Sequence, residues 1–141
     1  MKNFLAVFLL AAVAPLSFGQ KTVLVITADQ GDYVLAAGGT VAGLITQGAT
    51  ARLVRAGNDE KDSWDLSPEE TARRAREESE QAAGVLGIKE VISLGYRSGE
   101  LAGVSPTELR DRLMFYIRLW KPDVVFLPNP YAHYDLSLIH I

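Results

Sequence analysis

The chain has 141 residues, of which 48% are hydrophobic and 22% charged, so one globular domain is expected and a disordered chain is excluded. Its net charge is −3, from 14 basic and 17 acidic residues, and a nucleic-acid partner is therefore not expected. The absence of cysteine excludes disulfides, thiolate metal sites and a lipid-modified N-terminal cysteine.

Residues 1–19 are predicted to be a secretory signal peptide. Lys2 precedes an apolar run and then the small residues Ser17 and Gly19, and the run is too short to span a bilayer comfortably. We therefore expect cleavage after Gly19 and an exported protein, periplasmic or extracellular, with no stable membrane anchor. A retained N-terminal anchor is the alternative.

Residues 20–135 are predicted to form a domain in which strands and helices alternate. Apolar, β-branched runs predict strands at 21–28, 50–56, 89–94 and 123–127. Helices are predicted over 34–47, 67–87 and 105–120, the last two starting at the capping boxes SPEE and SPTE. Such alternation implies βαβ units, so the predicted fold is α/β: a Rossmann-like, three-layer αβα domain with a mostly parallel sheet, incomplete at its C-terminus.

Ligands of such sheets bind beyond the carboxyl ends of the strands, here the loops 27–33, 56–65, 95–99 and 128–135. The first loop carries Asp29 and Asp32, which are either functional carboxylates or ordinary acids at a helix N-terminus. The second loop carries a set of acidic and aromatic residues that form either a sugar-contacting lip or a plain exposed loop: Asp59, Glu60, Asp62 and Trp64.

The last six residues, 136–141, are expected to be a non-native tail. Their sequence, LSLIHI, is the translation of CTGTCTCTTATACACATC, a transposon end used in preparing sequencing libraries. No helix follows the fourth predicted strand to cover the sheet, which agrees with a native sequence that is interrupted after Asp135. A genuine C-terminus is the alternative, and a stop codon after Ile141 in genomic DNA would establish it.

Several motifs, in this order, resemble the PIG-L or LmbE-like deacetylases. They are an acidic loop after the first strand, Gly38-Gly39-Thr40, an Arg-x-Glu helix ending in Leu-Gly, a Leu-Gly-Tyr loop, a Pro-Asp-Val-Val strand and a His-x-Asp loop. The resemblance runs from Val23 to Asp135. It implies a Rossmann-like zinc enzyme that removes the acetyl group from N-acetylglucosaminyl or related amides, and so a small-molecule or glycoconjugate substrate.

The first motif of that family, His-Pro-Asp-Asp-Glu, is only partly kept. Aligned on Gly38, the chain has Asp29 in place of the metal-binding His and Asp32 at the metal-binding Asp. Gly31 stands at the general-base Asp, where it cannot take a proton from water, and Tyr33 stands at the Glu. The resemblance therefore implies Asp29 and Asp32 as metal ligands and a missing base.

The second motif, His-x-Asp-His, matches His133 and Asp135, with Leu136 at the fourth position. The resemblance implies that His133 stabilises the oxyanion or acts as an acid, and Asp135 would replace the base or orient His133. On sequence alone, a histidine in such a turn is more often a surface or hydrogen-bonded residue than a ligand, and this is the alternative for His133.

Three further residues are implied as substrate-binding: Arg76, Asn58 and Tyr96. The resemblance makes Arg76 and Glu78 either a buried pair or a substrate contact, whereas an exposed charged helix face is the ordinary alternative. Gly38-Gly39 could serve simply to let the helix approach the sheet. Ser98 replaces an Asp that is common after Leu-Gly-Tyr.

Catalytic zinc needs about three protein ligands and an open position for water. Asp29, Asp32 and His133 could supply two oxygens and one nitrogen. A carboxylate-rich set favours other divalent metals, Mg²⁺, Ca²⁺ or Mn²⁺, more than a histidine-rich set does, so the cofactor is zinc or another divalent metal.

Two hypotheses of function remain. The first is an exported deacetylase or amide hydrolase of this family, and the second is a catalytically inactive member that binds a carbohydrate or a partner. A nucleotide-binding domain is disfavoured because Asp29 and Asp32 would repel phosphate. The sequence predicts no oligomeric state.

Overall fold

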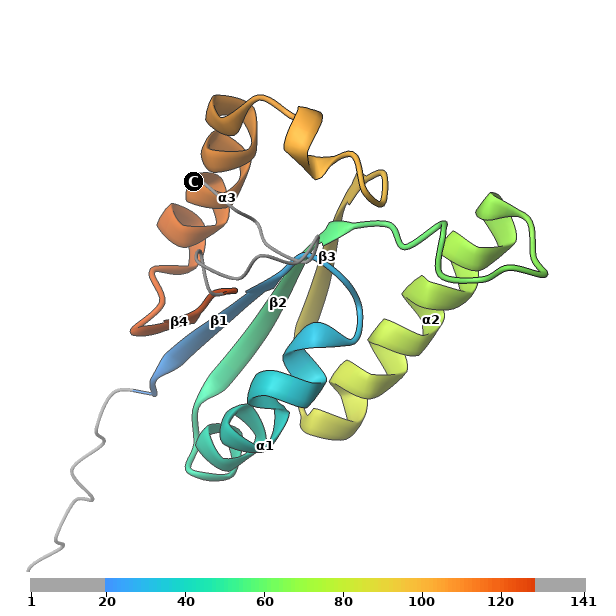
Figure 1. Cartoon of the computed structure of the whole chain (residues 1–141). Coiled ribbons are helices and arrows are strands. Elements are labelled where there is room, and N and C mark those ends of the chain that lie inside the picture. Colours follow the sequence, from blue (N-terminus) through green and yellow to red (C-terminus); the bar gives the residue numbers. More distant parts are fainter. Residues whose placement is uncertain (1–19, 129–141) are drawn as a thin grey trace, which may run out of the picture.

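The computed structural model describes residues 20–128, in which strands and helices alternate as predicted (Figure 1). The predicted signal peptide, the second motif with His133 and Asp135, and the tail 136–141 lie outside these residues. The elements are β1 (Thr22–Thr27), α1 (Asp32–Thr46), β2 (Thr50–Gly57), α2 (Pro68–Leu86), β3 (Glu90–Tyr96), a 3₁₀ turn η1 (Leu101–Gly103), α3 (Pro106–Trp120) and β4 (Val124–Phe126).

The four strands form one parallel sheet in the order β3-β2-β1-β4. In register, Val23 of β1 lies between Ala51 of β2 and Val124 of β4. Helices α1 and α2 cover one face and α3 covers the other, so the layers are αβα (Figure 1). The predicted α/β fold with a parallel sheet is therefore confirmed.

Each face of the sheet has its own hydrophobic core, which explains the nearly continuous apolar runs of β1 and β2. On the α3 face, Leu109 and Leu113 pack against Leu24 and Ile26. On the other face, Val41 of α1 and residues of α2 pack against the opposite side chains of the same strands. Because β1 and β2 are fixed from both sides, the loops at their carboxyl ends start from rigid positions.

The two predicted capping boxes differ in the structure. Ser67 Oγ accepts the Glu70 N–H at 3.2 Å, and α2 ends at Gly87, whose φ of 82° is left-handed. At α3 the prediction of a serine cap is wrong, because Ser105 makes no side-chain cap hydrogen bond. Proline at the first turn and the buried Leu109 and Leu113 are enough to start that helix.

The glycine pair of α1 does not bring the helix closer to the sheet. Gly38 is buried against the neighbouring helix, since an added Cβ would lie 3.7 Å from Leu86 Cδ1 of α2, an ordinary contact. Gly39 has nothing within 4 Å of such an atom. None of the helices within residues 20–128 is long and apolar enough to cross a membrane.

Candidate functional site

The first loop runs from the end of β1 to the start of α1 at the carboxyl edge of the sheet. Thr27 Oγ1 donates to the backbone oxygen of Asp29 at 2.9 Å, which turns the chain as it leaves the strand. Asp32 is the first residue of α1, and Gly31, its N-cap, supplies no capping side chain. Both predicted ligands, Asp29 and Asp32, are half-buried in this loop. Asp32 therefore also serves as an acid in the first turn of a helix.

The second loop contributes a buried carboxylate, Asp59, directly after β2. Asp59 is 0% exposed and has a left-handed φ of 57°, which aims its side chain back toward the sheet. Arg55 Nη1 donates to Asp59 Oδ2 at 3.0 Å, and the Gln30 N–H donates to the same oxygen at 3.2 Å. The second loop is thereby hydrogen-bonded to the first.

Asp29 and Asp59 meet at Gly57. A Cβ added at Gly57 would lie 3.4 Å from Asp29 Oδ1, 3.3 Å from Asp59 Oδ1 and 2.9 Å from the backbone oxygen of Ala28. The missing side chain of this glycine is what lets the two carboxylates share the space. Asp59 Oδ1 is buried and has no hydrogen-bond partner among the described residues.

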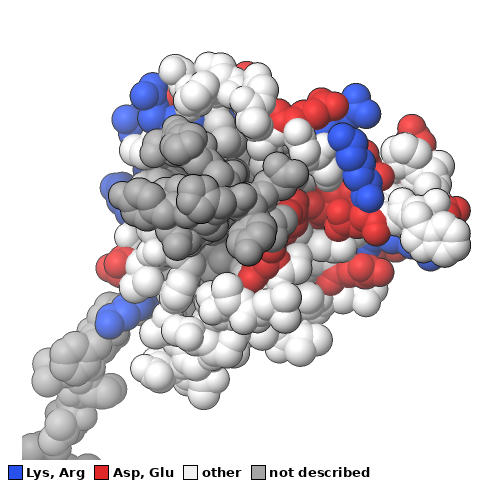
Figure 2. All heavy atoms as spheres, viewed as in Figure 1, with Lys and Arg blue, Asp and Glu red and all other residues white. Residues whose placement is uncertain are grey.

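Burial and neighbouring charges raise the pKa of three acids in this region: Asp32, Asp59 and Asp62. Burial, opposed by Arg55 and reinforced by a hydrogen bond and the charge of Asp29, raises the pKa of Asp59 to about 7. Burial and then the charge of Asp29 raise the pKa of Asp32, and the same two causes raise that of Asp62. Figure 2 shows Asp and Glu side chains gathered on the face of the molecule that carries the strand ends. This set, Asp29, Asp32, Asp59 and Asp62, is called the acidic site below.

The predicted sugar-contacting lip is wrong for two of its residues. Asp59 is fully buried and Glu60 is nearly so, because each is held by partners beneath the loop. Glu60 Oε2 accepts the Ser98 N–H at 3.0 Å, and although burial opposes it, this bond holds the pKa of Glu60 below its usual range. Trp64 is 96% exposed and Asp62 is exposed, so these two alone remain available to a ligand.

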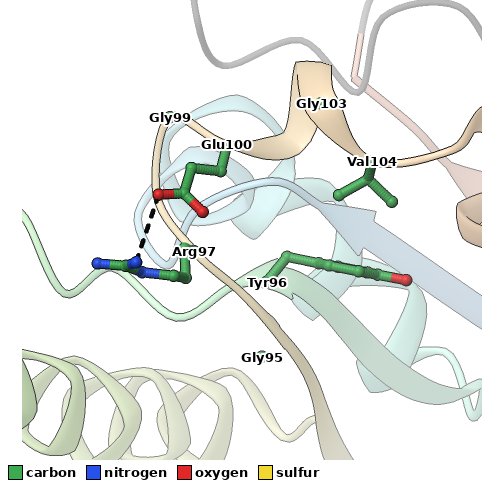
Figure 3. Close-up of a pocket in the computed structure, with 7 residues that line it drawn as sticks. All are labelled: Gly95, Tyr96, Arg97, Gly99, Glu100, Gly103 and Val104. Carbon is green, nitrogen blue, oxygen red and sulfur yellow. Dashed lines mark ion pairs between the residues drawn. The ribbon is translucent and has the colours of Figure 1, made fainter.

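Asn58 and Tyr96, both predicted to bind substrate, are neighbours at the carboxyl edge. The Asn58 N–H donates to the Tyr96 carbonyl at 2.8 Å. Tyr96 forms one wall of an open cavity of about 590 Å³, with Arg97, Glu100 and Val104 around it (Figure 3). The Tyr96 hydroxyl donates to Glu108 Oε1 at 2.9 Å, which fixes the ring. The structure thus places these two residues beside each other, and Tyr96 lines a cavity.

The predicted alternative that Arg76 and Glu78 form a buried pair is wrong. Both side chains are exposed on α2, and residues two apart on a helix point in different directions. Arg76 lines a cavity against β3, whereas Glu78 lines another cavity with Gln30 and Asp62 of the loops. Glu78 is therefore the member of the motif that faces the acidic site.

Tyr33, at the motif position of a Glu, belongs to the core. Its ring packs with Val23, Val25 and Val41, and its hydroxyl lies 3.5 Å from the backbone oxygen of Ser79. Burial raises the pKa of Tyr33. Tyr33 therefore connects α1 to α2. Neither Tyr33 nor Gly31, which has no side chain, offers a carboxylate to a substrate.

Sequence reasoning missed Arg55 as part of the site. Arg55 is 1% exposed at the end of β2 and donates from Nη1 to both Asp59 and the Ala75 carbonyl. The signal was available, because a single arginine near the end of the apolar stretch LVRAG implies a buried charge that needs a partner.

The described residues do not by themselves fit a metal ion. Within residues 20–128, no three His, Cys, Asp or Glu side chains are grouped so that they could hold one. Asp29 and Asp59 lie together and Asp59 Oδ1 is without a partner, which gives a partial set of hard oxygen donors. Zinc would need a further ligand from outside these residues.

The parallel αβα fold, with acidic side chains at the carboxyl ends of its strands, defines a Rossmann-like α/β protein. Proteins of this class bind ligands at that edge of the sheet. The chain belongs to the PIG-L family, described as GlcNAc-PI de-N-acetylase, whose model matches residues 24–137. The predicted family is therefore confirmed.

Similar proteins include two diacetylchitobiose deacetylases and a hydratase. The Thermococcus kodakarensis deacetylase is 29% identical over 82% of this chain and 43% of its own length. The N,N'-diacetylchitobiose deacetylase structure from Pyrococcus horikoshii has a TM-score of 0.74 and 32% identity, over 81% of this chain and 43% of that one. The 4-carboxy-2-hydroxymuconate hydratase GalB from Pseudomonas putida has a TM-score of 0.70 and 26% identity, and the match covers 84% of this chain and 52% of the hydratase. The chain spans 43% of the length of each of these two deacetylases.

Proposed function

We propose that the protein is an N-deacetylase, a hydrolase that cleaves the acetamide of an N-acetylglucosaminyl or similar sugar. The observation that carries the proposal is the convergence of carboxylates at the position of the family's first motif. Asp32 is kept there, and Asp29 and Asp59 meet beside it at Gly57. Membership of the PIG-L family and the two diacetylchitobiose deacetylases among its relatives support this reaction.

The proposed roles follow the motif. Asp29 and Asp32 would bind a divalent metal, zinc or a harder ion, and His133 with Asp135, outside the described residues, would complete the site and act on the reacting amide. Asn58 and Tyr96 would bind the sugar, because Tyr96 lines the open cavity at this edge of the sheet and Asn58 is hydrogen-bonded to the Tyr96 carbonyl. Arg76 would also contact substrate, from α2. When bound, the metal would supply an activated water.

The test is acetate release from N,N'-diacetylchitobiose by the full chain, combined with metal analysis. We expect one bound divalent metal and acetate release, both lost in Asp32→Ala and both kept in Asp111→Ala, which removes an exposed carboxylate from α3. A wild-type protein with neither metal nor acetate release contradicts the proposal.

A second candidate function is carbohydrate binding without hydrolysis. The observation that favours it is that two positions of the family's first motif lack a carboxylate. Gly31 has no side chain, and Tyr33 is buried in the core against α2. Saturable binding of N,N'-diacetylchitobiose in calorimetry, with no acetate released over hours, would establish this function in place of the first.

We also propose that the protein is exported. The N-terminal layout of Lys2, an apolar run and small residues supports it. Expression of the full sequence, followed by N-terminal sequencing of the exported fraction, should give a mature chain beginning at Gln20. An uncleaved chain retained with the cells contradicts this.

A further inference from the structure

The open cavity beside Tyr96 is built by one short segment of the chain. Its lining comes from residues 95–104, which include the end of β3 and the turn η1 (Figure 3). Its volume of about 590 Å³ lies within the range of small-molecule sites. The four carboxylates of the acidic site belong to other loops, so a group in this cavity and a group at the acidic site occupy different positions.

Two hydrogen bonds join this segment to the loop that carries Asp59. The Asn58 N–H donates to the Tyr96 carbonyl at 2.8 Å, and the Ser98 N–H donates to Glu60 Oε2 at 3.0 Å. Asn58 and Glu60 are the residues on either side of Asp59 in the sequence. When an acetylated sugar lies at the acidic site, the unit joined to it is therefore within reach of the cavity.

The two walls of the cavity differ in chemistry. The Tyr96 ring and Val104 lie on one side, and the side chains of Arg97 and Glu100 lie on the other (Figure 3). Arg97 Nη1 is 3.5 Å from Glu100 Oε1, and both side chains are more than half exposed, so a ligand can reach them. An apolar surface that faces a small number of polar groups is typical of ligand sites.

The Tyr96 ring is fixed by two residues of α3 that do not line the cavity. Its hydroxyl donates to Glu108 Oε1 at 2.9 Å, and Arg112 Cζ lies 4.9 Å from the ring centre. A ring that is already fixed loses little further side-chain entropy when a ligand packs on it. Such a rigid apolar surface suits the face of a sugar ring that carries its C–H groups.

The charges around the cavity are balanced. Arg97 lies 3.4 Å from Glu60 and 3.5 Å from Glu100. Lys61 adds a second cation, because a Cβ at Gly99 would lie 3.7 Å from its Nζ. Two cations thus accompany two carboxylates, so a negatively charged ligand gains little here. A hydroxyl group both donates and accepts, and it can bond to Glu100 and Arg97 together.

We propose that this cavity binds an uncharged sugar unit joined to the acetylated one, so that the substrate is a neutral di- or oligosaccharide. The apolar face of that unit packs on Tyr96 and Val104, and its hydroxyl groups bond to Arg97 and Glu100. This inference rests on the proposed deacetylase function for the position of the acetamide. It adds the class of the neighbouring unit and two specificity-determining residues, Arg97 and Glu100.

The test compares acetate release by the full chain from three substrates: N,N'-diacetylchitobiose, N-acetylglucosamine, and N-acetylglucosamine linked to glucuronic acid. We expect kcat/KM for diacetylchitobiose to exceed the other two values about 10-fold. Glu100→Ala and Tyr96→Leu should each lower the preference over the monosaccharide to about 2-fold. Glu100→Ala should also weaken the discrimination against glucuronic acid, because the repelling carboxylate is gone.

The matched control is Glu77→Ala on α2. The Glu77 side chain is 52% exposed and pairs with an arginine, as the 51% exposed Glu100 does, so its loss should leave the substrate preference unchanged. Equal kcat/KM for diacetylchitobiose and N-acetylglucosamine in the wild type overturns the inference. So does a preference for the glucuronic acid substrate, or one that Glu100→Ala and Tyr96→Leu alter no more than Glu77→Ala does.

Failure of the deacetylase proposal would look different, because no substrate would then release acetate. The affinities of the same three sugars, measured by calorimetry on the same variants, would still test the cavity. We expect the same order of preference in those affinities, and equal affinities for the disaccharide and the monosaccharide would overturn the inference there too.

Discussion

Two arginine–carboxylate clusters of this chain behave in opposite ways. At the end of β2, Arg55 and Asp59 are both buried, and burial raises the pKa of Asp59 to about 7. On the outer face of α2, Glu70 pairs with Arg73 and Arg74, and their hydrogen bonds lower the pKa of Glu70 to about 2. The same two chemical groups thus give a carboxyl that resists ionisation in one place and favours it in the other.

The difference comes from what surrounds each carboxylate. Glu70 accepts hydrogen bonds from Arg73 Nε and Nη2 and from Arg74 Nε while it remains in contact with water. Asp59 has lost its water, receives one guanidinium bond, and lies beside Asp29, whose charge repels its own. The presence of an ion pair therefore does not by itself determine whether its carboxyl group is ionised. The balance between the cost of desolvation and the hydrogen bonds donated to the carboxylate determines it.

The largest effect should come from removing the partner of the buried carboxylate. Arg55→Met leaves Asp59 buried without its cation, and we expect a loss of about 3–5 kcal/mol in the free energy of unfolding. Urea denaturation followed by circular dichroism measures it. Arg55→Met/Asp59→Asn should recover most of the loss, since no charge is then buried alone and asparagine tolerates the left-handed φ of 57°.

Arg73→Met is the matched change in the exposed cluster and should alter the unfolding free energy far less. A loss from Arg55→Met no larger than that from Arg73→Met would show that the buried pair does not differ from the exposed one.

The pH dependence of stability should also separate the clusters. The folded pKa of Asp59 is raised, so its contribution is complete below its unfolded pKa, near 3.8, and is lost as the pH rises toward about 7. We expect the wild type, measured with a chelator present, to lose on the order of 2–4 kcal/mol between pH 4 and pH 8. Asp32 and Asp62, whose pKa values are also raised, act in the same direction.

Asp59→Asn should flatten this slope while keeping an acceptor for Arg55. Glu70→Gln should leave the slope above pH 5 unchanged, because the folded pKa of Glu70 is lowered and its contribution is lost only as the pH falls below 4.5 toward about 2. Identical slopes for wild type and Asp59→Asn would remove Asp59 as the cause.

A glycine-to-alanine substitution should be more destabilising beside the buried cluster than on the surface of a helix. In Gly57→Ala the new Cβ would lie 2.9 Å from the Ala28 carbonyl and close to both Asp29 and Asp59, so we expect a loss of about 1–3 kcal/mol in the unfolding free energy. Gly39→Ala, on α1 with nothing within 4 Å, should instead gain about 1 kcal/mol through helix propensity. Thermal denaturation compares the two, and equal signs would contradict the crowding at Gly57.

The sequence predicted the fold well because its signals are local. A run such as TVLVIT predicts a strand, and Ser67-Pro68 predicts a helix start, without reference to the rest of the chain. The alternation of strands and helices then leaves few possible topologies. The family's motif likewise located the acidic loop at Asp29 and Asp32, because it is a short continuous stretch of the chain.

The contacts within the site were less predictable because they join separate loops. Nothing local indicates that Asp59 turns inward at a left-handed φ, that Arg55 holds it, or that Gly57 leaves space for Asp29. The acids of 59–62 appeared to be an exposed lip because charged loop residues usually are exposed. Arg55, an arginine within an apolar strand, was the one available sign that a carboxylate had to be buried with it.

The smallest predicted effect concerns how the exposed cluster is supported. Ser67 Oγ caps α2 by accepting the Glu70 N–H, whereas Ser105 makes no such bond at α3. Ser67→Ala should therefore cost about 1 kcal/mol in the unfolding free energy, and Ser105→Ala should cost almost nothing. If urea denaturation gives equal losses for both serines, the cap does not stabilise α2. Added salt should leave the Ser67 effect unchanged, because the hydrogen bond joins uncharged groups and is not screened.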